Sequence, residues 1–192
     1  MHRESLRITS TIADLNLQWS GFSITEGDYA EICSFSSPLN KDKQLNEMFL
    51  NIYNVSLPSP GKIAHYEGGS IFWSSPSQWF ISSKNHNPFF DRDIVDKFMQ
   101  LPIVTLQTDG WVSMNLKGSA CLTVLERLVK LNLNDSEFPP GSSTRTGCSH
   151  MTIFLQRPNQ ETDFIVLGAR SYAQSLLHAL VKTADNVLGE RK

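Results

Sequence analysis

The chain has 192 residues, of which 40% are hydrophobic, and its 17 basic and 19 acidic residues give a formal net charge of −2. This length suits one domain or two small lobes, and because the sequence lacks a basic block we expect no nucleic-acid binding. Cys33, Cys121 and Cys148 form an odd, widely spaced set typical of a reducing cytoplasm, and without a leader-like or membrane-length apolar run we expect neither export nor a membrane span.

The first half of the sequence predicts short strands. A strand is indicated over 29–35, followed by a polar stretch over 39–47 that we interpret as a loop or a poorly ordered segment. Residues 48–55 are apolar enough for a strand or for a short helix. Two further strands are predicted over 70–74 and 79–83, because Pro76 turns the chain between two runs of β-forming residues.

The middle of the sequence predicts a helix and then a hairpin. Apolar residues recur with helical spacing over 91–100. Two segments, 103–108 and 111–117, flank Asp109-Gly110, which favours a type I′ hairpin turn because both of its central positions need φ above zero. Gly118-Ser119 then opens a predicted helix with Ser119 as its N-cap.

The last third predicts another hairpin and a long helix. Strands are expected over 151–156 and 163–167, with the turn at Pro158-Asn159. The final helix is expected over 172–188, with Ser171 and Gln174 as a capping box and Gly189 as its stop. The succession of hairpins and helices predicts an α+β fold of antiparallel sheets with helices packed on one face.

The domain organisation follows from the same pattern. We expect a single domain over 1–192, with the option of two lobes that meet near residues 85–102. No G-x-G-x-x-G motif follows a predicted strand, so the sequence gives no sign of a dinucleotide-binding fold.

Two motifs are the most restrictive features of the chain. Phe138-Pro139-Pro140-Gly141 combines two fixed φ angles with a flexible glycine, and so predicts a rigid elbow before a polar run. Further along stands Arg170-Ser171-Tyr172-Ala173. With these two motifs, and with matching patterns around Trp73, Asp109 and Gly118, residues 70–188 resemble the gamma subunit of heterotetrameric sarcosine oxidase.

This resemblance implies an aminomethyltransferase-like fold with ferredoxin-like lobes. It also implies a complex that demethylates sarcosine to glycine, transfers the one-carbon unit to tetrahydrofolate and forms hydrogen peroxide. FAD, FMN, NAD, zinc and tetrahydrofolate are then expected in the partner alpha, beta and delta subunits. The gamma subunit itself is expected to hold no cofactor, no metal and no catalytic residue.

The candidate site residues are therefore those that could contact a partner. We name Phe138, Pro139, Pro140, Gly141, Arg145, Arg170 and Tyr172 as a hypothetical partner interface. Arg145 either pairs with a partner carboxylate or is a solvated loop residue. Arg170 precedes a helix, where its charge gains nothing from the helix dipole, so its expected partner is an external anion or an interdomain carboxylate.

Two catalytic interpretations are weaker. Cys148 and His150 could meet on one face of a strand, but thiolate chemistry needs an orienting group and a positive setting that the sequence does not offer. Asp109 could be a pocket carboxylate, yet its place in a turn already explains it. Trp73, Trp79 and Trp111 fit a buried sheet face better than a stacking platform.

The function predicted from sequence is that of a non-catalytic structural subunit of a sarcosine-oxidase complex. One alternative is a free-standing tetrahydrofolate-binding or aminomethyltransferase-like protein that kept the pocket of its fold. Another is a scaffold for a related N-methyl amino acid oxidase, because the substrate choice would reside in a different subunit.

Overall fold

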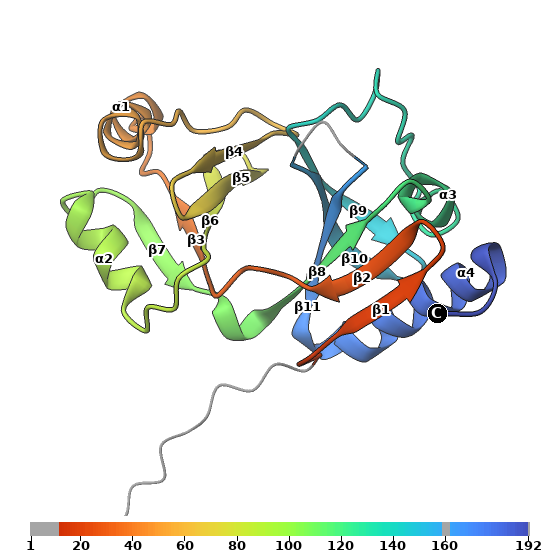
Figure 1. Ribbon diagram of the computed structural model, residues 1–192. Coiled ribbons are helices and arrows are strands. Elements are labelled where there is room, and N and C mark those ends of the chain that lie inside the picture. Colours follow the sequence, from red (N-terminus) through yellow and green to blue (C-terminus); the bar gives the residue numbers. More distant parts are fainter. Residues whose placement is uncertain (1–11, 159–161, 192) are drawn as a thin grey trace, which may run out of the picture.

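The computed structural model describes residues 12–158 and 162–191 of the chain. Two antiparallel sheets form its middle, and each sheet carries a pair of helices on its outer side (Figure 1). The fold class is thus α+β, as the sequence predicts. No helix in the described ranges is long and apolar enough to cross a membrane.

One sheet has six strands in the order β1-β2-β8-β11-β10-β9. Their bounds are Asn16–Trp19 (β1), Phe22–Glu26 (β2), Trp111–Lys117 (β8), Ser142–Cys148 (β9), Met151–Arg157 (β10) and Phe164–Ala169 (β11). Its outer side is covered by α3 (Cys121–Leu125) and α4 (Ala173–Leu188), and α4 buries Ala173, Leu176, Leu180 and Ala184.

The other sheet has five strands in the order β4-β5-β6-β3-β7. Their bounds are Glu31–Ser36 (β3), Ile63–Tyr66 (β4), Gly69–Ser75 (β5), Gln78–Ser83 (β6) and Ile103–Leu106 (β7). Helices α1 (Asp42–Tyr53) and α2 (Phe90–Lys97) cover its outer side. The helices bury Leu45, Phe49, Phe90 and Ile94 against this sheet.

The inner faces of the two sheets meet in a small apolar core that contains three phenylalanine rings. It consists of Ile32, Ile63, Phe72, Phe80, Phe154 and Leu167, with Tyr29 and Trp111 packed against it. The rings of Phe72 and Phe80 stack with their centres 5.2 Å apart, and the rings of Phe72 and Phe154 meet in a T-shaped contact, also with a distance of 5.2 Å between their centres. This core holds the two sheets together, because such aromatic contacts stabilise beyond the area that they bury.

Within the described residues the chain passes between the two sheets twice, at 27–30 and 107–110. The second passage corrects a prediction. Asp109-Gly110 does not turn a hairpin, because β7 pairs with β3 while β8 pairs with β2 and β11 in the other sheet. The dipeptide lies instead in the 3-10 helix η1 (Thr108–Gly110). Residues 85–102, the expected lobe boundary, contain α2 and lie beside the five-stranded sheet.

Several other predictions are confirmed. The strands predicted over 29–35, 70–74 and 79–83 correspond to β3, β5 and β6, and the helix predicted over 91–100 corresponds to α2. The hairpin predicted from 151–156 and 163–167 is the antiparallel pair β10 and β11. Of its predicted turn, Asn159 lies outside the described residues.

Three local predictions are wrong. Most of the polar stretch 39–47, interpreted as a loop, belongs to α1. Ser119 is not a cap, because α3 begins after Ala120 without a side-chain capping bond. Ser171 does not cap α4 either, since it lies inside the 3-10 helix η2 (Arg170–Tyr172), which precedes α4.

Candidate functional site

The proline elbow is held in place by backbone hydrogen bonds. The N–H of Gly141 donates to the carbonyl of Arg157 at 2.7 Å, and Ile63 N–H donates to the Gly141 carbonyl at 3.0 Å. Gly141 has φ of +79°, a region that favours glycine. The elbow therefore fixes the approach of β9 to the start of β4, where the two sheets meet.

The elbow's aromatic residue does not face outward. Phe138 is 3% exposed and belongs to the core under α3 and α4, whereas Pro139 and Pro140 are half-buried. The ring of Phe138 thus anchors the elbow from inside. If this segment contacts another protein, the prolines and Gly141 would make the contact.

Arg157 is a buried residue that the sequence did not single out. Its Nη1 donates to Asp135 Oδ1 at 2.6 Å and to the carbonyl of Phe138 at 3.0 Å, and its guanidinium lies 5.5 Å from the centre of the Phe164 ring. The charge is thereby paired and ties the elbow to the end of β10. The sequence around Arg157 gives no sign of this role, because its partners Asp135 and Phe138 lie 22 and 19 positions earlier in the chain.

Arg145 lies on β9 at the edge of a cleft between the sheets. Its guanidinium stands 5.6 Å from the centre of the Phe154 ring, which is opposite it on β10. The cleft has a volume of about 250 Å³, and its aromatic lining consists of Phe35, Trp79, Phe80, Trp111 and Phe154. Arg145 forms no ion pair with any residue that the structure describes. We name this site the aromatic cleft.

Arg170 lies near the second passage between the sheets. Its Nη1 is 3.5 Å from Asp109 Oδ1, a long and partly exposed ion pair. The carboxylate expected for this arginine is thus one of the chain's own, and such exposed pairs contribute little to stability. Tyr172 is half exposed beside it.

The seven predicted interface residues do not form one patch. The strand register places Ser142 opposite Arg157 and Ala169 opposite Trp111, so the elbow and Arg170 lie at opposite ends of the six-stranded sheet. Arg145 lies between them on β9. A partner that touched all of these segments would have to cover the length of the sheet.

A second cleft, of about 330 Å³, opens between the sheets and is lined by polar groups. The Tyr29 hydroxyl donates to Gln156 Oε1 at 2.7 Å, and the Ser70 hydroxyl donates to the Tyr29 oxygen at 3.2 Å. Burial raises the pKa of Tyr29 to about 12, so its hydroxyl stays a donor at neutral pH. Buried Gln156 Nε2 has no hydrogen-bond partner among the residues described.

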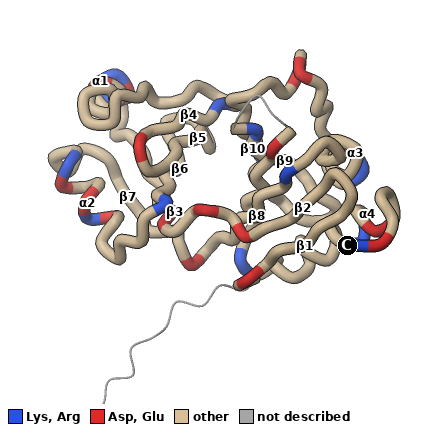
Figure 2. Tube along the Cα trace, viewed as in Figure 1, with Lys and Arg blue, Asp and Glu red and all other residues tan. Residues whose placement is uncertain are grey.

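The charges around this polar cleft are mixed. Its lining includes two lysines, two aspartates and one histidine, namely Lys84, Lys117, Asp28, Asp163 and His65. Desolvation in the cleft, followed by the nearby Lys84 charge, lowers the pKa of His65 although much of its side chain is exposed. Basic and acidic residues are also interspersed along the rest of the trace (Figure 2). Within 12–158 and 162–191, no three His, Cys, Asp or Glu side chains are grouped as metal ligands.

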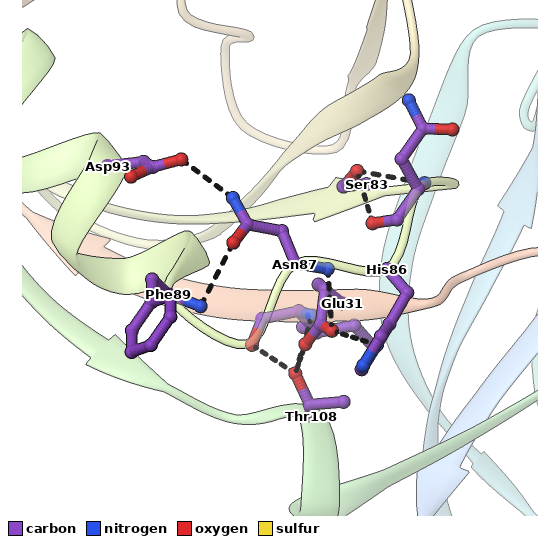
Figure 3. A network of polar contacts seen from close by, with 9 residues as sticks. Glu31, Ser83, His86, Asn87, Phe89, Asp93 and Thr108 are labelled. Carbon is purple, nitrogen blue, oxygen red and sulfur yellow. Dashed lines mark hydrogen bonds and ion pairs between the residues drawn. The ribbon is translucent and has the colours of Figure 1, made fainter.

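A buried carboxylate lies where β3 begins (Figure 3). Glu31 is 3% exposed; its Oε1 lies 2.6 Å from His86 Nδ1 and accepts the Asn87 N–H at 3.1 Å. Its Oε2 accepts the Thr108 hydroxyl at 2.8 Å. This network fastens the segment before α2 to both passages between the sheets, so its role is structural.

The cysteine and histidine of the other catalytic interpretation do not meet. Cys148 is 1% exposed and faces the core under α3 and α4, whereas His150 is exposed in the turn between β9 and β10. Burial raises the pKa of the Cys148 thiol to about 11, so the thiolate nucleophile is scarce at neutral pH. The tryptophans agree with the sheet-face interpretation: Trp79 is buried, and Trp73 and Trp111 are partly buried.

Comparison with solved structures identifies the fold. A chain of heterotetrameric sarcosine oxidase from Corynebacterium sp. U-96, in complex with pyrrole 2-carboxylate, superposes with a TM-score of 0.75 at 16% identity, covering 89% of this chain and 87% of that one. The aminomethyltransferase T of the glycine cleavage system from Bartonella henselae superposes with a TM-score of 0.58 at 12% identity.

The two neighbours differ in how much of them is matched. The match covers 84% of this chain but 45% of the aminomethyltransferase, so the chain spans just under half of that enzyme's length. No protein-family model matches the sequence, and neither does any curated protein. The chain thus has the fold shared by a sarcosine oxidase chain and an aminomethyltransferase, as the sequence resemblance predicts.

Proposed function

We propose that this chain is a non-catalytic structural subunit of a heterotetrameric sarcosine-oxidase-type complex in the cytoplasm, with alpha, beta and delta subunits as partners. The observation that carries this proposal is the structural match with a chain of a heterotetrameric sarcosine oxidase, which covers 89% of this chain and 87% of that one. The match with the aminomethyltransferase leaves more than half of that enzyme without a counterpart.

The chemistry of the chain's own residues supports the proposal. Burial raises the pKa of all three thiols, which places them outside the role of nucleophile at neutral pH. The buried carboxylate of Glu31 is committed to Thr108, Asn87 and His86. The proposal assigns FAD, FMN, NAD, zinc and tetrahydrofolate to the partner subunits.

Co-expression tests the proposal. The chain would be produced with the alpha, beta and delta candidates of its own organism, and size-exclusion chromatography would show whether it elutes with them. We expect a complex that forms hydrogen peroxide from sarcosine. A chain that stays monomeric with every candidate would refute the assignment.

Calorimetry of the isolated chain with tetrahydrofolate separates the proposal from the folate-binding alternative. We expect no heat of binding up to about millimolar ligand, where affinity is worth only about 4 kcal/mol. Micromolar binding by this chain alone would contradict a purely structural role and would direct attention to the polar cleft.

A further inference from the structure

Strand β7 is an edge with an unpaired backbone. It lies at the end of the five-stranded sheet and pairs with β3, and no strand within the described residues pairs with its other side. Gln107 N–H donates to the Ile32 carbonyl, so alternate residues Thr105 and Ile103 also direct their backbone groups toward β3. The N–H and C=O groups of Val104 and Leu106 therefore face outward.

This edge lacks the usual protection. The strand reads Ile103-Val104-Thr105-Leu106, with no charge, and Ile103 is 67% exposed. Natural proteins commonly blunt exposed edges with lysines, bulges or covering segments. The outer edge of β9, by contrast, is partly covered, because the Ser143 N–H donates to the Gly61 carbonyl in the segment before β4.

The aromatic cleft continues from this edge. Ile103 and Thr105 line it on one side, and Arg145 lines it on the other. Arg145 is its one charged lining residue, so the cleft presents a cation above an aromatic wall and contains no acidic side chain of its own. An extended segment lying along β7 would bring alternate side chains into this cleft.

We propose that β7 receives an extended segment of a partner subunit as a sixth strand, with a carboxylate side chain of that segment paired to Arg145. This inference rests on the proposed function and names the surface that serves it. Charge complementarity favours a partner with an acidic residue over a second copy of this chain, because neither β7 nor the cleft offers Arg145 a carboxylate.

Hydrogen exchange provides the sharpest readout, because β3 already protects two of the four strand amides. On assembly with the large subunits, the amides of Val104 and Leu106 should become protected, while those of Ile103 and Thr105 are protected in both states. Protection of Val104 and Leu106 in the dilute isolated chain would overturn the inference, as would protection that appears only when the isolated chain is concentrated.

Variants test the two contacts separately. Leu106→Pro removes an outward N–H while leaving the bonds to β3, and Leu106→Thr is its matched control. Arg145→Glu reverses the charge in the cleft, and Arg127→Glu reverses an exposed charge beyond α3 as its control. We expect the two test variants to weaken assembly about tenfold or more, and the controls to change it less than about threefold.

The outcomes separate the two proposals. If the wild-type chain assembles but both test variants assemble equally well and neither outward amide gains protection, the docking surface is wrong and the subunit assignment stands. If the wild-type chain joins no large subunit, the assignment itself fails, and the inference fails with it. Circular dichroism of each variant confirms the fold, and the exchange experiment on the wild-type chain decides the matter should Leu106→Pro unfold.

Discussion

The Thr108 hydroxyl donates a 2.8 Å hydrogen bond to Oε2 of the buried carboxylate of Glu31. It also accepts the N–H of Ile32 at 3.0 Å. Glu31 begins β3 directly after the first passage between the sheets, and Thr108 belongs to the second passage. One hydroxyl therefore joins the two connections on which the relative position of the sheets depends.

Replacing this hydroxyl should destabilise the protein. Thr108→Val keeps the side-chain shape but leaves Glu31 Oε2 without this hydrogen bond and the Ile32 N–H without an acceptor, so we expect the free energy of unfolding to fall by about 1–3 kcal/mol. Urea denaturation measures this. Thr105→Val, on the exposed edge strand, is the control and should change it by less than about 0.5 kcal/mol. Equal effects of the two changes would refute the role of Thr108.

The burial of the three thiols leads to two predictions, one for their reaction with thiol reagents and one for the pH dependence of the free energy of unfolding. Burial raises the pKa of Cys33 and Cys121 to about 12, and that of Cys148 to about 11, from the ordinary 9.0. The native chain should therefore resist a thiol reagent at pH 8 and react at three sites once unfolded in urea. Fast labelling of the native chain at any of them would contradict this burial.

The stability consequence of these thiols has a definite sign. Between pH 9 and about 11 the unfolded chain loses thiol protons that the folded chain retains, so the folded chain binds more protons. Their contribution is complete below pH 9 and is lost as the pH rises through the folded values. We expect the free energy of unfolding to decline from pH 9 upward, as followed by urea denaturation at a series of pH values.

Glycine 118 offers a test of the connection after β8. Gly118 has φ of +115°, and a Cβ built there would lie 2.3 Å from the carbonyl oxygen of Gly21. Gly118→Ala should cost more than about 2 kcal/mol, because strain and a backbone clash add. Gly147→Ala is the matched control, since its Cβ would meet no atom within 4 Å. Similar melting temperatures for both variants would show that the connection can relax.

The sequence predicts those elements whose pattern is local. The hairpin of β10 and β11 and the helix α4 follow from alternation and from a single apolar stripe. Helix α1 is predicted only in part: its second half falls in 48–55, which allows a strand or a short helix, whereas its first half falls in the polar stretch 39–47. The exposed apolar residues Leu50 and Ile52 blur the stripe of Leu45 and Phe49. The hairpin turn predicted at Asp109-Gly110 is wrong for another reason. Its segment is fixed by Thr108 bonding to Glu31, a residue 77 positions away, which no short-range turn rule contains.

The candidate site divides in the same way. The rigidity of the elbow is readable from two prolines and a glycine, and the confirmed fold agrees with the family that these motifs suggested. That Phe138 faces inward depends on its contacts with the core under α3 and α4. The exposure of the β7 edge could not be predicted either, because the same segment was assigned to a hairpin with β8.

Arg157 provides the last prediction, since it links stability to the shape of the elbow. Its guanidinium is buried and donates to Asp135 and to the Phe138 carbonyl. Arg157→Leu should lower the free energy of unfolding by about 1–3 kcal/mol, because the Phe138 carbonyl loses its charged donor. Limited proteolysis of the folded variant should then cut within 131–141 faster than in the wild-type chain.

This variant also tests whether the elbow serves assembly through its rigidity. Arg157 is too buried to touch a partner. If the variant binds the large subunits more weakly, the cause would therefore be a less rigid elbow. Arg127→Glu, an exposed change elsewhere, should leave both proteolysis and binding unchanged. If Arg157→Leu accelerates cleavage without weakening assembly, the elbow stabilises the fold and has no role in assembly. Partner contacts should then be sought at β7 and the aromatic cleft.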